Sequence, residues 1–195
     1  MNTSIKNLQI VLNAMGANLA TDGISGGHTL GAISLVEAPP WIKTAMFEIG
    51  VHEIKGIKHD TRVLEYHAVS GGYSTDEVPW CGSFINWVML QNNFDTVDTP
   101  ARAKSWLGFG APSKVPVVGS IAVKSRKGGG HVCFVVAETN DGKLLCIGGN
   151  QNDEVNIRAY AKSDFMAFRV PYNYKDHVYS LAIANLSNTK SNREA

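Results

Sequence analysis

The spacing of apolar residues changes along this chain of 195 residues, and that change constrains its fold more than any other feature. Near the N-terminus, Ile5, Leu8, Val11 and Leu12 recur at helical spacing, and Gly16 follows as a stop. In the second half of the chain the apolar residues alternate instead, as they do in half-buried strands. Helices followed by several antiparallel strands predict an α+β domain whose helices pack against one sheet.

The most informative helical pattern follows Pro79. The segment CGSFINWVMLQNNF carries Phe84, Ile85 and Val88 on one helical face, which predicts a buried helix with Cys81 in its first turn. The polar, turn-rich run from Gly50 to Pro79 predicts a loop. Shorter helices are expected after a cap at Thr29, over WIKTAMFEIG beyond Pro39-Pro40, and between Ala101 and Gly110.

Alternating segments in the second half predict strands over SIAVKSR, HVCFVVAE, KLLCIGG, VNIRAY and MAFRVPY. Thr-Asn-Asp-Gly, between the second and third of these, is a hairpin signal. After about Lys175 the chain becomes polar, and its last residues, NLSNTKSNREA, are expected to form a frayed tail.

Charge and hydropathy exclude some classes of partner. The formal net charge is +1, which gives no global electrostatic reason to expect nucleic acid. No stretch approaches the length of a membrane span, and the N-terminus lacks the features of a secretory signal. We therefore expect a compact protein that accumulates in the cytoplasm and does not insert into membranes.

The cysteines stand at positions 81, 133 and 146, so at least one of the three thiols stays free within the chain. A metal site built from His131, Cys133 and Cys146 would lack an evident fourth ligand, so no metal is expected. A zinc-dependent amidase site using other histidines has no H-E-x-x-H motif to support it. The remaining histidines are scattered through polar segments, and most of them are expected at the surface. They are His28, His52, His59, His67 and His177.

Cys81 and His131 are the candidates for nucleophilic chemistry. A helix N-terminus with a nearby imidazole stabilises a thiolate through unpaired backbone N–H groups and opposite charge. His131 follows Gly128-Gly129-Gly130 and opens a strand, where the glycines leave room for a substrate. The alternatives are that Cys81 is a small buried hydrophobe and that His131 lies at a loop edge.

The predicted hairpin brings an amide side chain beside His131. Cross-strand pairs share a face of the sheet, so a two-residue loop sets His131 opposite Asn150. A three-residue loop makes the partner Gln151, and a further shift makes it Asn152. Such an amide can hold the tautomer of the imidazole, although Asn and Gly at this place are also turn formers.

These residues carry a resemblance over roughly Pro39 to Tyr172. The chain resembles the papain-like cell-wall hydrolases of the NlpC and CHAP type, especially phage-encoded lysins. The segments that resemble them are APPWIKTAMFEIGVHEIKG, RVLEYHAVSGGYSTDEVPWCGSFINWVML, ARAKSWLGFG, GGGHVCFVV and IGGNQNDEV. The resemblance implies a papain-like α+β fold, with Cys81 as nucleophile, His131 as base and Asn150 as the residue that orients the histidine. It also implies that the backbone N–H of Cys81 meets the oxyanion.

The first segment, LQIVLNAMGANLATDGISGGHTLGAI, is similar to the start of a small helical peptidoglycan-binding repeat, here without its third helix. The alternative is a helical pair that packs on the catalytic domain. We therefore expect a short helical segment over residues 1–38, a hydrolase domain over 39–175, and a mostly polar C-terminal extension over 176–195.

The resemblance implies a cysteine amidase or peptidase that cleaves peptidoglycan as a monomer, without a metal or organic cofactor. It would act as a phage endolysin, held in the host cytoplasm before it reaches the wall. The alternatives are an antibacterial amidase toxin with an immunity partner and a non-catalytic wall-binding or tail protein. Trp80, Tyr73 and Gln151 are the predicted substrate-binding residues, although aromatic side chains near a core more often pack there.

Overall fold

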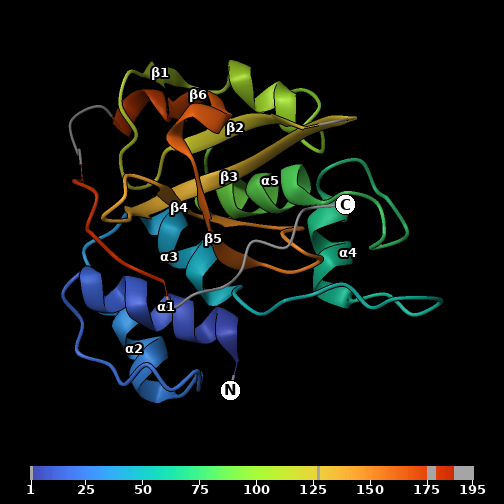
Figure 1. Cartoon of the computed structure of the whole chain (residues 1–195). Helices are drawn as coiled ribbons and strands as arrows, with labels where there is room; N and C mark the ends of the chain where they lie inside the picture. The colour runs from blue at the N-terminus through green and yellow to red at the C-terminus, as the bar shows by residue number, and fades with distance from the viewer. Residues whose placement is uncertain (1, 127, 175–178, 187–195) are drawn as a thin grey trace.

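A six-stranded antiparallel sheet forms the centre of the computed structural model, which describes residues 2–126, 128–174 and 179–186 (Figure 1). The strands lie in the order β1-β6-β2-β3-β4-β5, so β1 and β5 form the edges of the sheet. The strand bounds are β1 Ala111–Ser113, β2 Ile121–Arg126, β3 Gly129–Glu138, β4 Leu144–Gly148, β5 Asn156–Tyr160 and β6 Phe165–Val170.

The helices gather on one face of this sheet. Helix α5 packs on β3, α3 packs on α5, and α1 reaches the edge strand β5. Figure 1 shows α1, α2 and α3 together beneath the sheet. The helix bounds are α1 Thr3–Ala14, α2 Gly27–Leu35, α3 Pro40–Phe47, α4 Thr61–Ala68 and α5 Cys81–Gln91, with 3-10 turns η1 Ala103–Gly108, η2 Lys162–Asp164 and η3 Tyr172–Tyr174.

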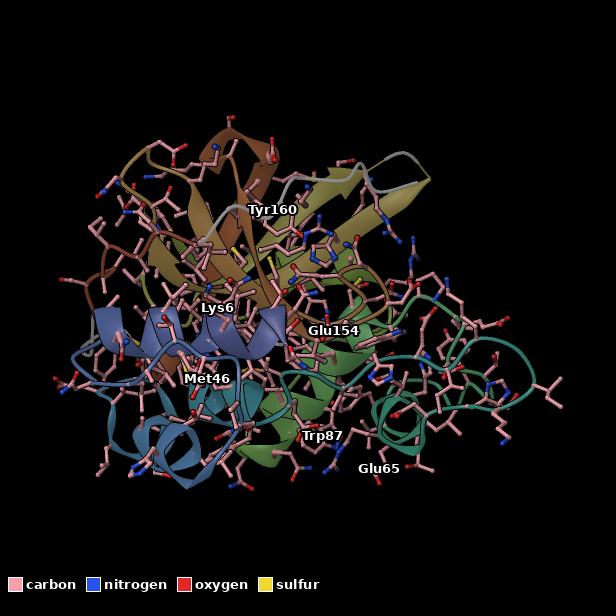
Figure 2. The ribbon with its side chains drawn as sticks, turned by 60° about the horizontal axis from the view of Figure 1, so that its bottom comes forward. Lys6, Met46, Glu65, Trp87, Glu154 and Tyr160 are labelled. Atoms are coloured by element: carbon pink, nitrogen blue, oxygen red, sulfur yellow. The ribbon has the colours of Figure 1, made fainter. Side chains whose placement is uncertain are left out.

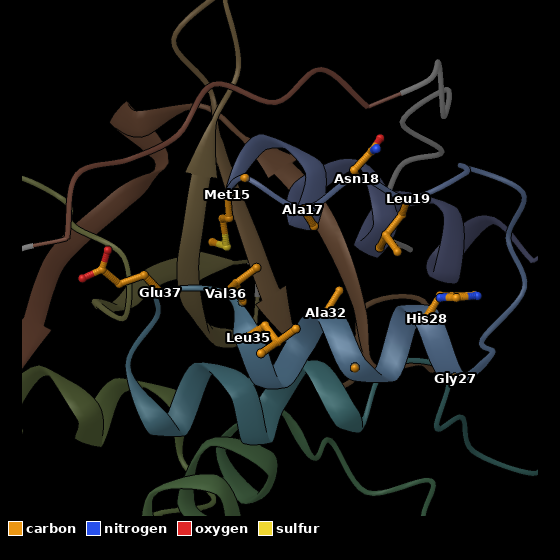
Figure 3. A pocket seen from close by; sticks show the side chains of 12 residues that line it. Met15, Ala17, Asn18, Leu19, Gly27, His28, Ala32, Leu35, Val36 and Glu37 are labelled. Atoms are coloured by element: carbon orange, nitrogen blue, oxygen red, sulfur yellow. The ribbon is translucent and has the colours of Figure 1, made fainter.

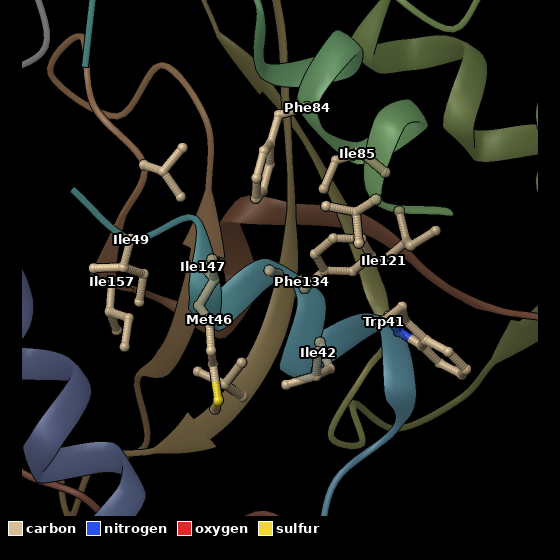
Figure 4. Close-up of a cluster of buried hydrophobic side chains, with 14 of the residues drawn as sticks. Trp41, Ile42, Met46, Ile49, Phe84, Ile85, Ile121, Phe134, Ile147 and Ile157 are labelled. Atoms are coloured by element: carbon tan, nitrogen blue, oxygen red, sulfur yellow. The ribbon is translucent and has the colours of Figure 1, made fainter. Parts of the chain in front are cut away.

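The two faces of the sheet bury different clusters of side chains, because successive residues of a strand point to opposite faces. On β3, Phe134 and its neighbours on the same face meet the helices, and Figure 4 shows this core around Phe84 and Ile147. Cys133 and Val135 point to the other face, where they form a smaller cluster closed by aromatic residues of β6. Helices on one antiparallel sheet confirm the predicted α+β class.

Helix α1 belongs to the main core. The side chain of Asn2 caps its start by accepting hydrogen bonds from Ser4 N and Ile5 N, at 2.9 and 3.1 Å. Leu8 and Leu12 are buried in the same cluster as the sheet residues. This shared burial agrees with the alternative in which residues 1–38 form a helical pair that packs on the rest of the domain.

A cavity of about 550 Å³ lies between the end of α1 and α2 (Figure 3). Its walls include Met15, Leu19 and Leu35, with His28 and Glu37 among the polar groups. It is formed by residues of the N-terminal segment alone, and Cys81 and His131 are not among its lining residues. Binding of cell wall by residues 1–38 stays a prediction.

Local structure departs from the predictions at two helices. Thr29 does not cap α2, which begins after Gly26; its buried hydroxyl instead lies 3.2 Å from Gln9 Nε2. Helix α4 lies within the run that we predicted as a loop. Asp60 caps this helix by accepting from Arg62 N at 2.9 Å, and Tyr66 lies on its buried face. With eight residues, α4 is shorter than the stretch over which helical periodicity can be judged.

Part of the predicted C-terminal extension packs on the sheet. Glu138, the last residue of β3, donates from its backbone N–H to Ala182 O at 2.9 Å and accepts from Ala184 N at 2.8 Å. The predicted frayed tail lies largely outside the described residues, since 187–195 are not among them. Within the described ranges, no helix is long and apolar enough to cross a membrane.

Replacing Leu12 by Ala tests whether α1 belongs to the core. Leu12 is fully buried, so Leu12→Ala should lower the free energy of unfolding by roughly 2–5 kcal/mol. Leu35, which is 86% exposed, provides the control: Leu35→Ala should change it by less than about 0.5 kcal/mol. Urea unfolding followed by tryptophan fluorescence measures both. An unchanged main transition in Leu12→Ala would show that the segment is independent of the core.

Candidate active site

Cys81 is the first residue of α5. Trp80 precedes it at the N-cap position and offers no side-chain hydrogen bond, so the first N–H groups of the helix stay available to the thiol and to a substrate oxygen. Gly82 follows, and a Cβ there would overlap the carbonyl oxygens of Pro100 and Ala101. The glycine therefore lets the start of α5 lie directly against this stretch of backbone.

The surroundings of the Cys81 thiol act on its pKa in opposite directions. Cys81 is only 4% exposed, and this burial raises the pKa of the thiol above its ordinary value. The backbone N–H of Val132, the guanidinium of Arg126 and the first N–H groups of α5 lower the pKa, but burial dominates. The thiol is therefore neutral at rest and needs a base to become a nucleophile.

His131 lies near the start of β3, paired with Lys124 of β2, and is 2% exposed. Its Nε2 lies 3.1 Å from Oε1 of Gln151. No hydrogen bond joins Cys81 and His131 in the part of the chain that the structure describes. Cys81 instead meets Val132, the residue after His131. Catalytic hydrogen bonds are often long in a ligand-free enzyme and shorten when substrate binds.

Gln151 determines which nitrogen of His131 carries the proton. Its Nε2 donates to the backbone oxygen of Asn156 at 2.8 Å and to the Oδ1 of the same residue at 3.0 Å. The backbone oxygen can only accept, so the amide nitrogen of Gln151 faces Asn156 and its carbonyl faces His131. That carbonyl also only accepts, so the proton of the neutral imidazole is assigned to Nε2. Nδ1 is then the nitrogen that can accept a proton, and the thiol of Cys133 on the same strand also interacts with this ring.

The structure sets Gln151, rather than Asn150, against the imidazole. The pairing of Val135 with Cys146, continued along the ladder, would place Asn150 opposite His131. However, β4 ends at Gly148, and Asn150 adopts a left-handed φ of 53° that turns the chain out of the sheet. The turn folds the side chain of Gln151 back beneath the strand. The catalytic role given to Asn150 stays a prediction, but the contact with His131 belongs to its neighbour.

The two glycines before Asn150 let both halves of the site approach the end of β4. A Cβ on Gly148 would lie 2.9 Å from Gln151 Oε1, on the face of the sheet that holds His131. A Cβ on Gly149 would lie 2.6 Å from the ring of Trp80, on the side of α5. Side chains at these two positions would therefore collide with the groups that flank the candidate nucleophile and base.

The predicted substrate contacts differ in exposure. The indole of Trp80 is fully buried, and its Nε1 donates to Glu53 Oε2 at 3.0 Å. Gln151 is fully buried too, whereas Tyr73 is 40% exposed. In this conformation Trp80 and Gln151 are buried below the surface of the site. Of the three side chains, only Tyr73 is accessible to a substrate. Substrate binding by these residues stays a prediction.

Sequence reasoning missed Asn156, Tyr160 and Arg126. The signal for the first two lay in the alternation of VNIRAY, which puts them on one face of β5. Tyr160 donates its O–H to Gln151 Oε1 at 2.9 Å. The effect of Arg126 on Cys81 depends on how the β2–β3 hairpin meets α5, which a strand pattern does not reveal.

The other two thiols and one further histidine are buried in the protein. Cys133 and Cys146 are fully buried, as predicted for core thiols. His67 is also fully buried, with Nδ1 3.1 Å from Ser83 Oγ, and is an exception to the prediction that most of the other histidines lie at the surface. Burial lowers the pKa of His67. Among the described residues no group of three His, Cys, Asp or Glu side chains is placed to hold a metal.

Comparison with known families gives a match over part of the chain. Residues 73–150 match the model of the CHAP domain, and the matched range contains Cys81 and His131 and ends one residue before Gln151. CHAP domains typically cleave peptidoglycan as amidases or peptidases. The sheet and helices are consistent with a papain-like CHAP fold. No curated protein and no solved structure matches the chain.

Removing the charge of Arg126 should raise the pKa of the Cys81 thiol, because the guanidinium favours the thiolate. Alkylation by iodoacetamide near pH 8 should therefore slow by about 2- to 4-fold in Arg126→Gln. Lys114→Gln, which removes an exposed charge elsewhere, is the control, and Cys81→Ala identifies the reacting thiol. An unchanged pH dependence of alkylation in Arg126→Gln would contradict this electrostatic contact.

Gly148→Ala should displace the carbonyl of Gln151 from His131, because the added Cβ would lie 2.9 Å from Oε1. Activity on cell walls should fall at least about 10-fold, the loss typical when a catalytic group is misplaced. Gly31→Ala is the matched control, since a Cβ there meets nothing within 4 Å. Turbidity loss of purified walls measures both variants. Full activity in Gly148→Ala would argue against the observed position of Gln151.

Proposed function

We propose that this chain is an endolysin: a phage-encoded peptidoglycan hydrolase that cuts an amide bond with Cys81 as nucleophile and His131 as base. The CHAP match over residues 73–150 supports peptidoglycan as the substrate class. The proposed bond lies in a stem peptide or between N-acetylmuramic acid and L-alanine. The enzyme would accumulate in the host cytoplasm and reach the wall when the membrane is breached.

One observation carries the assignment of His131 as the base. Gln151 presents a carbonyl to Nε2 at 3.1 Å, while its own amide nitrogen is held by Asn156 at 2.8 Å. This arrangement keeps the proton on Nε2 and leaves the lone pair on Nδ1. A base that must take a proton from the neutral thiol of Cys81 requires such an acceptor.

The proposed reaction proceeds in two stages. Nδ1 of His131 accepts the thiol proton as Sγ of Cys81 attacks the carbonyl carbon of the scissile amide. The backbone N–H of Cys81, at the start of α5, would stabilise the oxyanion of the tetrahedral intermediate. His131 then gives the proton to the leaving amine, and an acyl-enzyme forms. Water activated by His131 hydrolyses the acyl-enzyme and frees the thiol.

Purified, outer-membrane-stripped cell walls test the proposal. The wild type should lower their turbidity, and Cys81→Ala should show less than about 1% of that rate because the nucleophile is lost. Cys146→Ala removes a buried thiol from the face of the sheet opposite to Cys81 and should stay active. Fragment masses separate the bonds: a free muramic carboxyl indicates an amidase, and cut peptides indicate an endopeptidase.

Two outcomes would overturn the proposal in different ways. Lysis by Cys81→Ala at the wild-type rate would remove Cys81 as nucleophile. Folded wild-type protein that binds walls without releasing fragments would favour a non-catalytic wall-binding or tail protein. Lysis together with a neighbouring gene for an inhibitor of this chain would favour an antibacterial amidase toxin over an endolysin.

A further inference from the structure

The carbonyl oxygen of Gln151 accepts two hydrogen bonds from two different strands. His131 Nε2 of β3 lies 3.1 Å from it, and the hydroxyl of Tyr160 on the edge strand β5 lies 2.9 Å from it. All three side chains are at least nine-tenths buried, so these bonds form away from bulk water. In such surroundings a polar contact has a larger effect on geometry than at the surface.

We propose that Tyr160 is a positioning residue of the hydrolase reaction: its hydroxyl holds the carbonyl of Gln151 against Nε2 of His131. The inference rests on the proposed function, in which His131 is the base. Tyr160 acts through Gln151 and touches neither the substrate nor the thiol in this role.

The orientation of the Gln151 amide decides which tautomer His131 adopts. With the carbonyl toward His131, the imidazole must donate from Nε2, and Nδ1 accepts the thiol proton. With the amide reversed, Gln151 would donate to Nε2, the imidazole proton would move to Nδ1, and His131 would lose its free acceptor. In the first orientation the O–H of Tyr160 donates to the carbonyl at 2.9 Å and holds it beside His131. Asn156 favours the same orientation from the other end of the amide.

The ring of Tyr160 is itself held in place. Lys124, the partner of His131 across β2 and β3, has its Nζ 4.3 Å from the centre of the ring. The same Nζ lies 3.8 Å from Asp164, which anchors the ammonium over the ring. Phe165 packs edge-on against Tyr160, with ring centres 5.9 Å apart. These contacts fix the phenol, and its hydroxyl is thereby directed at Gln151.

Tyr160 also contacts the base directly, since its ring centre lies 5.9 Å from that of His131. Figure 2 shows Tyr160 on the sheet. The ring contacts and the hydrogen bond can be separated experimentally. Phenylalanine keeps the ring with Lys124, Phe165 and His131 around it and removes only the hydroxyl.

Tyr160→Phe should lower kcat on cell-wall fragments about 5-fold, as expected for the loss of one buried hydrogen bond, and leave KM unchanged. The matched control is Tyr172→Phe, because Tyr172 is 69% exposed and lies on a different segment. It should behave as wild type. A loss in KM alone, or an equal loss in Tyr172→Phe, would overturn the positioning role.

A double-mutant cycle tests whether Tyr160 acts through Gln151. Gln151→Met keeps the length of the side chain and removes its carbonyl, so adding Tyr160→Phe to it should cause no further loss in kcat. A purely structural role of the tyrosine would instead give the same 5-fold loss in both backgrounds. Circular dichroism and thermal unfolding of each variant verify that the proteins compared are folded.

A measurement without substrate keeps the inference separate from the proposed function. In ¹⁵N-edited NMR spectra of the wild type, His131 should show a proton on Nε2 that exchanges slowly with water. Tyr160→Phe should speed its exchange by several fold, while Tyr172→Phe should not change it. If the wild type cleaves no peptidoglycan, the proposed function fails and this exchange rate still decides on Tyr160. Equal exchange rates in all three proteins would overturn the inference.

Discussion

In the proposed mechanism, the buried amide of Gln151 is the contact on which the orientation of His131 depends. Asn156 fixes one end of the amide as a donor, which makes the other end an acceptor for His131. A glutamine with both ends free could reverse at little cost, and the imidazole would then follow it. The strand β5 therefore does more than close the sheet, because it supplies Asn156 and Tyr160, the two partners that remove this freedom.

The end of β4 brings the two halves of the site together. Cys81 approaches from the helical face and Gln151 from the opposite face, and Gly148 and Gly149 stand between them. Glycine at both places costs conformational entropy when the chain folds, and each lacks a side chain that could fill the core. The close approach of Trp80 and Gln151 to these positions explains why the chain uses glycine at both.

Much of this arrangement follows from the sequence, and the limits have physical causes. Periodicity predicted α5 with Cys81 in its first turn and the strand that carries His131, because long buried elements repeat their apolar residues. The catalytic role predicted for Asn150 stays a prediction, while the contact with His131 is made by Gln151, the partner in the three-residue-loop register. Ladder geometry predicts partners only while the strands stay paired, and left-handed residues after Gly148 end that pairing. Helix α4 was missed because its eight residues stand within a polar, turn-rich run, and the packing of Tyr66 against Phe84 that buries one face is a tertiary contact.

Burial of the Cys81 thiol explains why the proposed mechanism depends on the orientation of the His131 imidazole. An exposed cysteine at a helix N-terminus could form a thiolate from its surroundings alone, but burial of Cys81 raises its pKa beyond what Val132 and Arg126 offset. Burial limits oxidation of the thiol, and in the proposed mechanism the thiol depends on a proton acceptor at the moment of attack. A misdirected His131 would leave it inert. In the proposed mechanism a buried, neutral thiol therefore requires a firmly oriented base, and the buried hydrogen bonds around Gln151 hold His131 in one orientation.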